Sequence, residues 1–159
     1  MEQPVTALPR DPTCTDPMVV NCVAYSTSGK KVRDITIDEI SDVIKNPDMF
    51  VWVGLHEPDE ALLEKLREEF DLHELAIEDA HNAHQRPKID VYADSLFIVA
   101  HTAQVVGGKI LFGETHIFMG RNYLVTVRHG ASLSYAIARR SCEQTPELLR
   151  HRDAIADRT

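Results

Sequence analysis

The side chains best suited to chemistry lie in one short stretch rich in acids and histidines. Glu78 and Asp79 adjoin there, and His81 and His84 follow at a spacing of three residues. On a helix, adjacent side chains diverge by about 100°, whereas residues three apart share a face. Carboxylate oxygens suit hard cations such as Mg²⁺, and Glu78 with His81 and His84 would form a mixed set for Zn²⁺. The stretch therefore predicts one of two kinds of divalent-metal site.

Each of these interpretations has a purely structural alternative. Acids are common on solvated helix faces, and histidines in a last turn favour the negative end of the helix macrodipole. The H-x-x-H spacing is weak evidence for zinc, because more specific motifs have the form H-E-x-x-H or paired C-x-x-C. Mg²⁺ keeps several waters, so one carboxylate from each of two facing copies would suffice to hold it. The residues alone leave these alternatives open.

No other group of residues predicts an enzyme. The serines lie in no G-x-S-x-G nucleophile elbow, and Gly107-Gly108 lacks the Lys-Ser/Thr pair and the following helix of a phosphate-binding loop. The basic pair Arg86 and Lys88 is expected to anchor a helix-to-strand junction by pairing with a local carboxylate such as Asp90 or Asp94. We therefore expect neither catalysis nor a small-molecule substrate.

The length, charge and apolar content of the chain restrict the kinds of partner that it is expected to bind. The chain has 159 residues, which suits one domain, and its net charge of −8 argues against binding to nucleic acid. Residues 38–79 hold fourteen acidic and three basic side chains, a net of −11, on an otherwise mildly basic chain. That segment is either a solvated surface or one that recruits cations. The longest apolar runs, such as residues 49–55, span about seven residues, whereas a membrane-spanning helix needs roughly 20.

The hydrophobic pattern predicts the elements that must position the acidic stretch. Apolar and β-branched runs predict strands over residues 19–25, 31–35, 50–55, 89–92, 96–102, 114–119 and 123–127. Helical spacing predicts helices that begin near residues 36, 57, 73, 133 and 146. The third of these would carry the acids and histidines and end before Pro87. This order predicts an α+β or mixed α/β fold, a sheet with helices packed on it.

The N-terminal residues 1–17 are predicted to be a disordered lead-in. They are polar and contain four prolines, so they have neither the basic start nor the apolar core of a signal peptide. Three scattered cysteines without a C-x-x-C pair favour a reducing compartment.

Several blocks of sequence match one family pattern. They are VWVGL at 51–55, LHELAIEDA at 72–80, QRPKIDVY at 85–92, GE at 113–114, IFMG at 117–120, YLVTVRHG at 123–130 and PELLR at 146–150. Together they resemble the cytoplasmic N-terminal domain of CorA-type magnesium transporters, and residues 72–92 are the most specific part. We accordingly assign residues 18–152 to such a regulatory domain and residues 153–159 to a truncated C-terminal tail.

The resemblance implies an α-β-α sandwich around a mixed, largely antiparallel sheet, located at the cytoplasmic face of the membrane. In the family, a long stalk helix leads to two transmembrane helices with a Gly-Met-Asn loop, and five identical subunits surround one pore. Mg²⁺ bound between neighbouring cytoplasmic domains holds the channel closed. Asp79 matches the acid of this regulatory site that lies within the domain, and Glu78 beside it is a weaker candidate. An isolated domain would bind Mg²⁺ weakly.

The chain also departs from the family pattern. It contains no stalk, no transmembrane helix and no Gly-Met-Asn loop, so by itself it is not expected to transport ions. Two alternatives stay open. One is the cytoplasmic domain of the related zinc-transporting branch, in which His81 and His84 would gain a role with Zn²⁺. The other is a truncated, non-transporting interaction module.

Overall fold

A seven-stranded sheet forms the centre of the molecule, and the computed structural model describes it with its flanking helices over residues 15–150. The strands are β1 (Val19–Ser26), β2 (Lys31–Asp34), β3 (Met49–His56), β4 (Lys88–Tyr92), β5 (Ser95–Val106), β6 (Lys109–Met119) and β7 (Tyr123–Gly130). Their order is β2-β1-β3-β7-β6-β5-β4. Only the β3–β7 pair is parallel among these strands, which confirms the mixed, largely antiparallel sheet.

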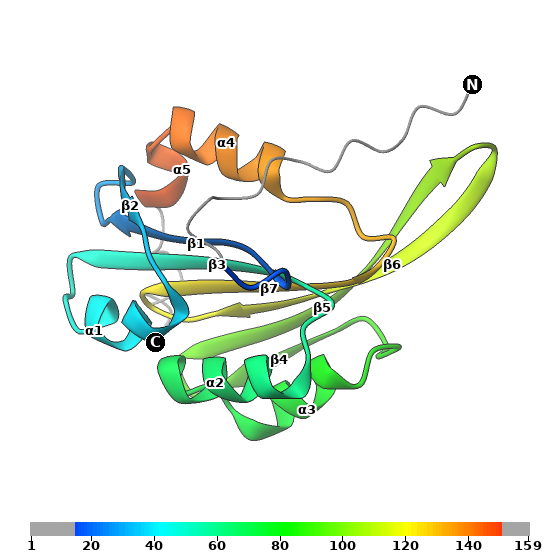
Figure 1. Ribbon diagram of the computed structural model, residues 1–159, viewed down its shortest axis with the longest axis horizontal. Helices are drawn as coiled ribbons and strands as arrows, with labels where there is room; N and C mark the ends of the chain where they lie inside the picture. Colours follow the sequence, from blue (N-terminus) through cyan, green and yellow to red (C-terminus); the bar gives the residue numbers. More distant parts are fainter. Residues whose placement is uncertain (1–14, 151–159) are drawn as a thin grey trace.

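Helices cover both faces of the sheet (Figure 1). The short η1 (Ile37–Glu39) leads into α1 (Ile40–Ile44), which lies on one face with α2 (Glu60–Phe70) and α3 (Glu74–His81). The opposite face carries α4 (Ala136–Gln144) and α5 (Glu147–Arg150). The α-β-α sandwich is therefore confirmed, and the elements follow the predicted order. None of the helices between residues 15 and 150 is long and apolar enough to cross a membrane.

Strand β3 is, with β1, among the most buried elements, as its continuous apolar run predicts. Six of its eight residues, Phe50 to Leu55, are buried, because β1 and β7 flank it and helices cover both of its faces. The larger apolar cluster packs β3 beneath α1, α2 and α3. A smaller cluster, formed around Tyr25, Trp52 and Leu149, lies beneath α4 and α5. Trp52 is buried in this smaller cluster.

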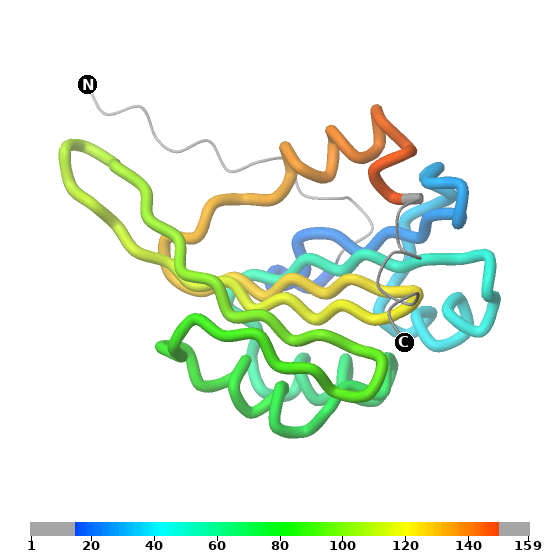
Figure 2. The backbone as a smooth tube through the Cα atoms, turned by 180° about the vertical axis from the view of Figure 1, so that it is seen from behind, coloured from blue at the N-terminus to red at the C-terminus, as the bar shows by residue number. Residues whose placement is uncertain are grey.

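The β5–β6 hairpin continues beyond the sheet as a long two-stranded arm (Figures 1 and 2). Its turn is Gly107-Gly108, as predicted, and both glycines have positive φ, at 56° and 75°. Such angles favour glycine in a two-residue hairpin turn. The arm exposes Val105, Ile110 and Phe112.

Helix α2 begins at Asp59, whose carboxylate accepts a hydrogen bond from the Leu62 amide at 2.8 Å. The apolar stripe of this helix faces the core, since Leu62, Leu63, Leu66 and Phe70 are all buried. The cap sets where α2 starts, and the buried stripe sets which side of the helix faces the sheet. The chain then passes through Asp71 into α3.

Asp59→Ala should lower the free energy of unfolding by about 1 kcal/mol, because it removes the acceptor for an N-terminal amide of α2. Urea denaturation followed by circular dichroism measures the loss. Asp59→Asn is the matched control and should cost clearly less, since its amide oxygen can still cap the helix. Equal losses in the two variants would show that the cap is not the cause.

Candidate metal site

Helix α3 presents Glu78 and Asp79 close to its C-terminal end. His73 begins the helix: its Nδ1 accepts a hydrogen bond from the Leu75 amide at 3.2 Å, and its ring stacks on Tyr92 with centroids 4.1 Å apart. Three other residues, Ala76, Ile77 and Ala80, bury the helix against the sheet. Leu75 lies about one helical step from this face and is exposed.

The Asp79 carboxylate points toward the edge strand β4. Its Oδ2 accepts a hydrogen bond from Lys88 Nζ at 2.6 Å, and the same Nζ lies 2.8 Å from Asp90 Oδ2. The hydrogen bonds to Asp79 and then to Asp90 raise the pKa of Lys88 above its ordinary value. The pairing of Lys88 with Asp90 bears out the expectation for Lys88, whereas the structure of residues 15–150 shows no such ion pair for Arg86. The pairing with Asp79 was not anticipated.

The structure separates the two histidines of the stretch. Helix α3 ends at His81, an exposed residue, whereas His84 lies beyond the helix with φ of 76°. The two rings therefore do not share a helical face, which corrects the expectation from their spacing. Glu78 remains on the helix and is exposed. Glu78, His81 and His84 are consequently not assembled into a mixed zinc set.

Glu114 on β6 explains why the chain leaves the helix early. Its buried carboxylate accepts hydrogen bonds from the backbone amides of His84, at 2.8 Å, and Gln85, at 3.2 Å. The Gln85 carbonyl in turn lies 2.7 Å from His101 Nε2. A carboxylate that satisfies two amides draws the segment between α3 and β4 toward the sheet, so the helix cannot continue to Pro87.

A buried polar network extends from Glu114 beneath α3. His116 Nε2 forms a very short contact with the Glu114 carboxylate, and the His116 ring packs edge-on against that of His129 at 5.3 Å. His129 Nε2 lies 2.9 Å from the Ala80 carbonyl, and its Nδ1 lies 3.1 Å from the Glu57 carboxylate. The network therefore ties the C-terminal end of α3 to β6, to β7 and to Glu57, the residue that follows β3.

The interpretation of the sequence missed this network, although a signal for it was present. In β6 the side chains of Glu114, His116 and Phe118 share one face of the strand, so a carboxylate and an imidazole occupy buried positions beside an aromatic residue. Polar groups at inward positions need partners. That pattern identifies a buried network, but it does not identify the partners.

Burial sets the protonation of this network. Burial lowers the pKa of the His116 ring, against the opposing effect of the Glu114 carboxylate. Burial by itself would raise the pKa of Glu114, but the His116 ring and the amides of Gln85 and His84 produce a net lowering. Two smaller electrostatic effects also act on the pKa of His116: the His129 ring lowers it and the Asp79 carboxylate raises it. A neutral imidazole beside an ionised carboxylate is the arrangement that these shifts favour at neutral pH.

Acidification should therefore destabilise the protein through His116. Because its pKa is lowered by folding, the unfolded chain takes up the proton first as pH falls through about 6.5, and stability is lost. Urea denaturation at a series of pH values should show a smaller loss between about pH 7 and 5 in His116→Gln than in the wild type. His129 is retained in both proteins, so the difference between the two profiles is assigned to His116. Parallel pH profiles would contradict this assignment.

The donors near Asp79 could supply only part of a metal site within one copy of the chain. Between residues 15 and 150, no three His, Cys, Asp or Glu side chains are grouped so that they could hold a metal ion together. What α3 offers is carboxylate oxygen on adjacent residues, a hard donor that fits Mg²⁺ better than Zn²⁺. The fit to Mg²⁺ is therefore partial, and further ligands must come from water or from another chain or segment.

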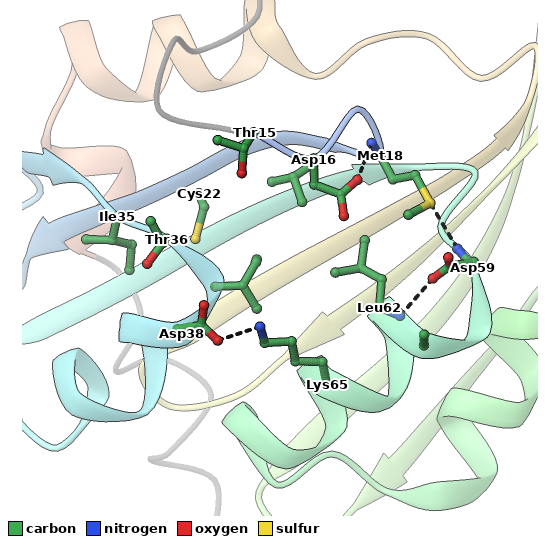
Figure 3. A pocket seen from close by; sticks show the side chains of 13 residues that line it. Thr15, Asp16, Met18, Cys22, Ile35, Thr36, Asp38, Asp59, Leu62 and Lys65 are labelled. Atoms are coloured by element: carbon green, nitrogen blue, oxygen red, sulfur yellow. Dashed lines mark hydrogen bonds and ion pairs between the residues drawn. The ribbon is translucent and has the colours of Figure 1, made fainter.

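A cavity of about 380 Å³ lies elsewhere, between β1, η1 and the start of α2 (Figure 3). Apolar side chains such as Cys22, Ile35 and Leu62 line it, and Lys65 forms an ion pair with Asp38 at its edge. Neither the two acids nor the two histidines of the predicted metal stretch line this cavity. It is therefore separate from the candidate site.

A family model and a curated relative both match this chain, and their descriptions agree with each other. The family model described as "CorA-like Mg2+ transporter protein" matches residues 47–156. A curated relative, "Putative metal ion transporter YfjQ" of Bacillus subtilis (strain 168), is 29% identical over 133 residues, which is 83% of this chain and 40% of the relative. The chain thus spans well under half the length of that relative.

Solved structures share the fold at low sequence identity. Full-length CmaX aligns with a TM-score of 0.64 and 16% identity, covering 84% of this chain and 42% of CmaX. The soluble domain of CorA from Methanocaldococcus jannaschii aligns with a TM-score of 0.50 and 16% identity, covering 77% of this chain and 45% of that one. The family model covers most of the chain, and the fold agrees with it. This chain therefore belongs to the family of CorA-like Mg²⁺ transporter proteins.

Proposed function

We propose that this chain is the cytoplasmic regulatory domain of a CorA-type Mg²⁺ transporter, in which Mg²⁺ acts as a regulatory ion at Asp79. The observation that carries the proposal is the family match over residues 47–156, because it includes both Glu78 and Asp79. The partly exposed carboxylate of Asp79 near the end of α3 supports a ligand role, since Mg²⁺ prefers carboxylate oxygens. In this proposal the domain senses the ion, and the pore lies in other parts of the protein.

The incomplete donor set supports a site shared between copies. We propose that five identical domains form a ring at the cytoplasmic face of the membrane, each joined to its own stalk and transmembrane helices. Packing acidic surfaces such as residues 38–79 side by side costs like-charge repulsion, and a bridging cation removes it. Because Mg²⁺ binds the assembled arrangement more tightly than a single domain, it shifts the equilibrium toward the closed ring, and its loss favours opening.

The chemistry of the donors supports Mg²⁺ over Zn²⁺ at this site. Asp79 and Glu78 supply hard oxygen, whereas His84 lies outside α3 and away from the helical face of His81. Calorimetric titration with ZnCl₂ distinguishes the zinc-transporting branch. If the protein binds Zn²⁺ tightly and stoichiometrically, and if His84→Ala abolishes this binding, then the regulatory ion is Zn²⁺ and not Mg²⁺.

The test of the proposed function is protection from proteolysis. Mg²⁺ should slow trypsin digestion of the assembled protein, and Asp79→Asn should weaken that effect. A protein that Mg²⁺ does not protect, or one that it protects equally well with and without the Asp79 carboxylate, would overturn the regulatory role assigned to this site.

A further inference from the structure

We propose that Lys88 is a built-in competitor for the cation at Asp79, so that Mg²⁺ coordinates the Oδ2 atom of this carboxylate only by displacing the Lys88 ammonium group. The inference rests on the proposed function, because it concerns the same carboxylate. It adds a residue that sets the concentration at which the site responds.

The position of the Lys88 ammonium group is set by three elements. It lies 2.6 Å from Asp79 on α3, 2.8 Å from Asp90 on β4, and 5.7 Å from the ring centroid of Phe97 on β5. Lys88, Asp90 and Tyr92 alternate with the exposed Ile89 and Val91, so the first three face α3.

The ends of β4 are both attached to α3. Tyr92 stacks on His73, the residue that begins α3, and Lys88 contacts Asp79 near the other end of the helix. Phe97 lies directly opposite Asp90 in the β4–β5 register. The strand register therefore holds the Lys88 ammonium group beside Asp79. The ammonium group of an ordinary surface lysine, in contrast, moves freely.

A tethered cation is an effective competitor because it is always at high local concentration. To coordinate the atom that now accepts from Lys88, Mg²⁺ must break that ion pair. A partly exposed pair contributes at most about five-fold to an affinity. Lys88 therefore weakens the binding of Mg²⁺, which suits a sensor for an ion that is present at high concentration.

Asp90 makes the displacement easier. When Mg²⁺ takes the Asp79 carboxylate, Lys88 can keep its ion pair with Asp90, so one of its two partners is retained. Asp90 therefore acts through Lys88. Asp90→Asn should weaken Mg²⁺ binding about two-fold, and this effect should vanish once Lys88 has been replaced.

The experiment is a titration of the 159-residue chain with MgCl₂ at constant ionic strength, followed by the NMR shifts of the amides of residues 78–80. Lys88→Met keeps the apolar stem over Phe97 but removes the charge. Arg86→Met is the matched control, because Arg86 is an exposed cation two residues away. Asp79→Asn reports whether the shifts depend on the proposed ligand.

We expect Lys88→Met to lower the apparent dissociation constant for Mg²⁺ about five-fold and Arg86→Met to leave it nearly unchanged. Equal effects of these two variants, or no effect of Lys88→Met, would overturn the role assigned to Lys88 and would leave the proposed function unaffected. An effect of Asp90→Asn that persists in the Lys88→Met background would overturn the role of Asp90. Shifts that are the same in Asp79→Asn as in the wild type would instead overturn the proposed function, and the present inference with it.

Discussion

Asp79→Asn is expected to raise the Mg²⁺ concentration needed to protect the assembled protein from trypsin by about ten-fold. The substitution removes the negative charge that Mg²⁺ coordinates but keeps the shape of the side chain. The asparagine oxygen can still accept a hydrogen bond from Lys88, so the local fold should be preserved. The measurement is the rate of limited digestion across a MgCl₂ series at constant ionic strength, with the complete protein in its membrane or in detergent.

Asp94→Asn is the control for this experiment. Asp94 is an exposed acid in the turn between β4 and β5, and its removal changes the net charge by the same amount. The control should be protected by Mg²⁺ like the wild type. Equal losses in both variants would mean that overall charge, rather than a site at Asp79, governs the response.

Glu114→Ala is expected to lower the free energy of unfolding by about 3 kcal/mol. The carboxylate is buried and accepts hydrogen bonds from the amides of His84 and Gln85 and from the ring of His116. Alanine leaves these donors without an acceptor in a place that water reaches poorly. Urea denaturation monitored by circular dichroism measures the loss.

Glu114→Gln provides the matched comparison, because its amide oxygen can still accept hydrogen bonds in a side chain of the same shape. It should cost less than Glu114→Ala. In Glu114→Ala, hydrogen exchange at the Gln85 amide should also accelerate more than exchange in β3, because the damage begins in the segment that joins α3 to β4. A loss below about 1 kcal/mol in Glu114→Ala would contradict the structural role of this carboxylate.

Much of the fold was predictable from local patterns. The continuous apolar run of residues 49–55 predicted the buried strand β3. The helix predicted to begin near residue 36 is capped by the Glu39 carboxylate, which accepts a hydrogen bond from the Thr36 amide at 2.7 Å. The glycine pair at the tip of the arm predicted its turn. These features depend on residues that are near one another in the chain, so composition and spacing carry enough information to predict them.

Local patterns were insufficient at the ends of α3. A proline sets the last position at which a helix can end, but the helix can also end before that position. Here Glu114, thirty residues away from His84, ends α3 at His81. The same cause separates His84 from His81. The mixed zinc set thus failed because a long-range hydrogen bond competed successfully with the helix.

The identity of the acids at residues 78 and 79, their place on α3 and the hard-cation chemistry that they offer follow from the sequence, because residue type and helical spacing are local properties. The partner of Asp79 does not. Lys88 reaches it only because β4 pairs with β5 at the sheet edge beneath α3, and His129 reaches Ala80 because β7 lies beside β6. Contacts between elements depend on strand order and register, which the packing of the whole chain decides.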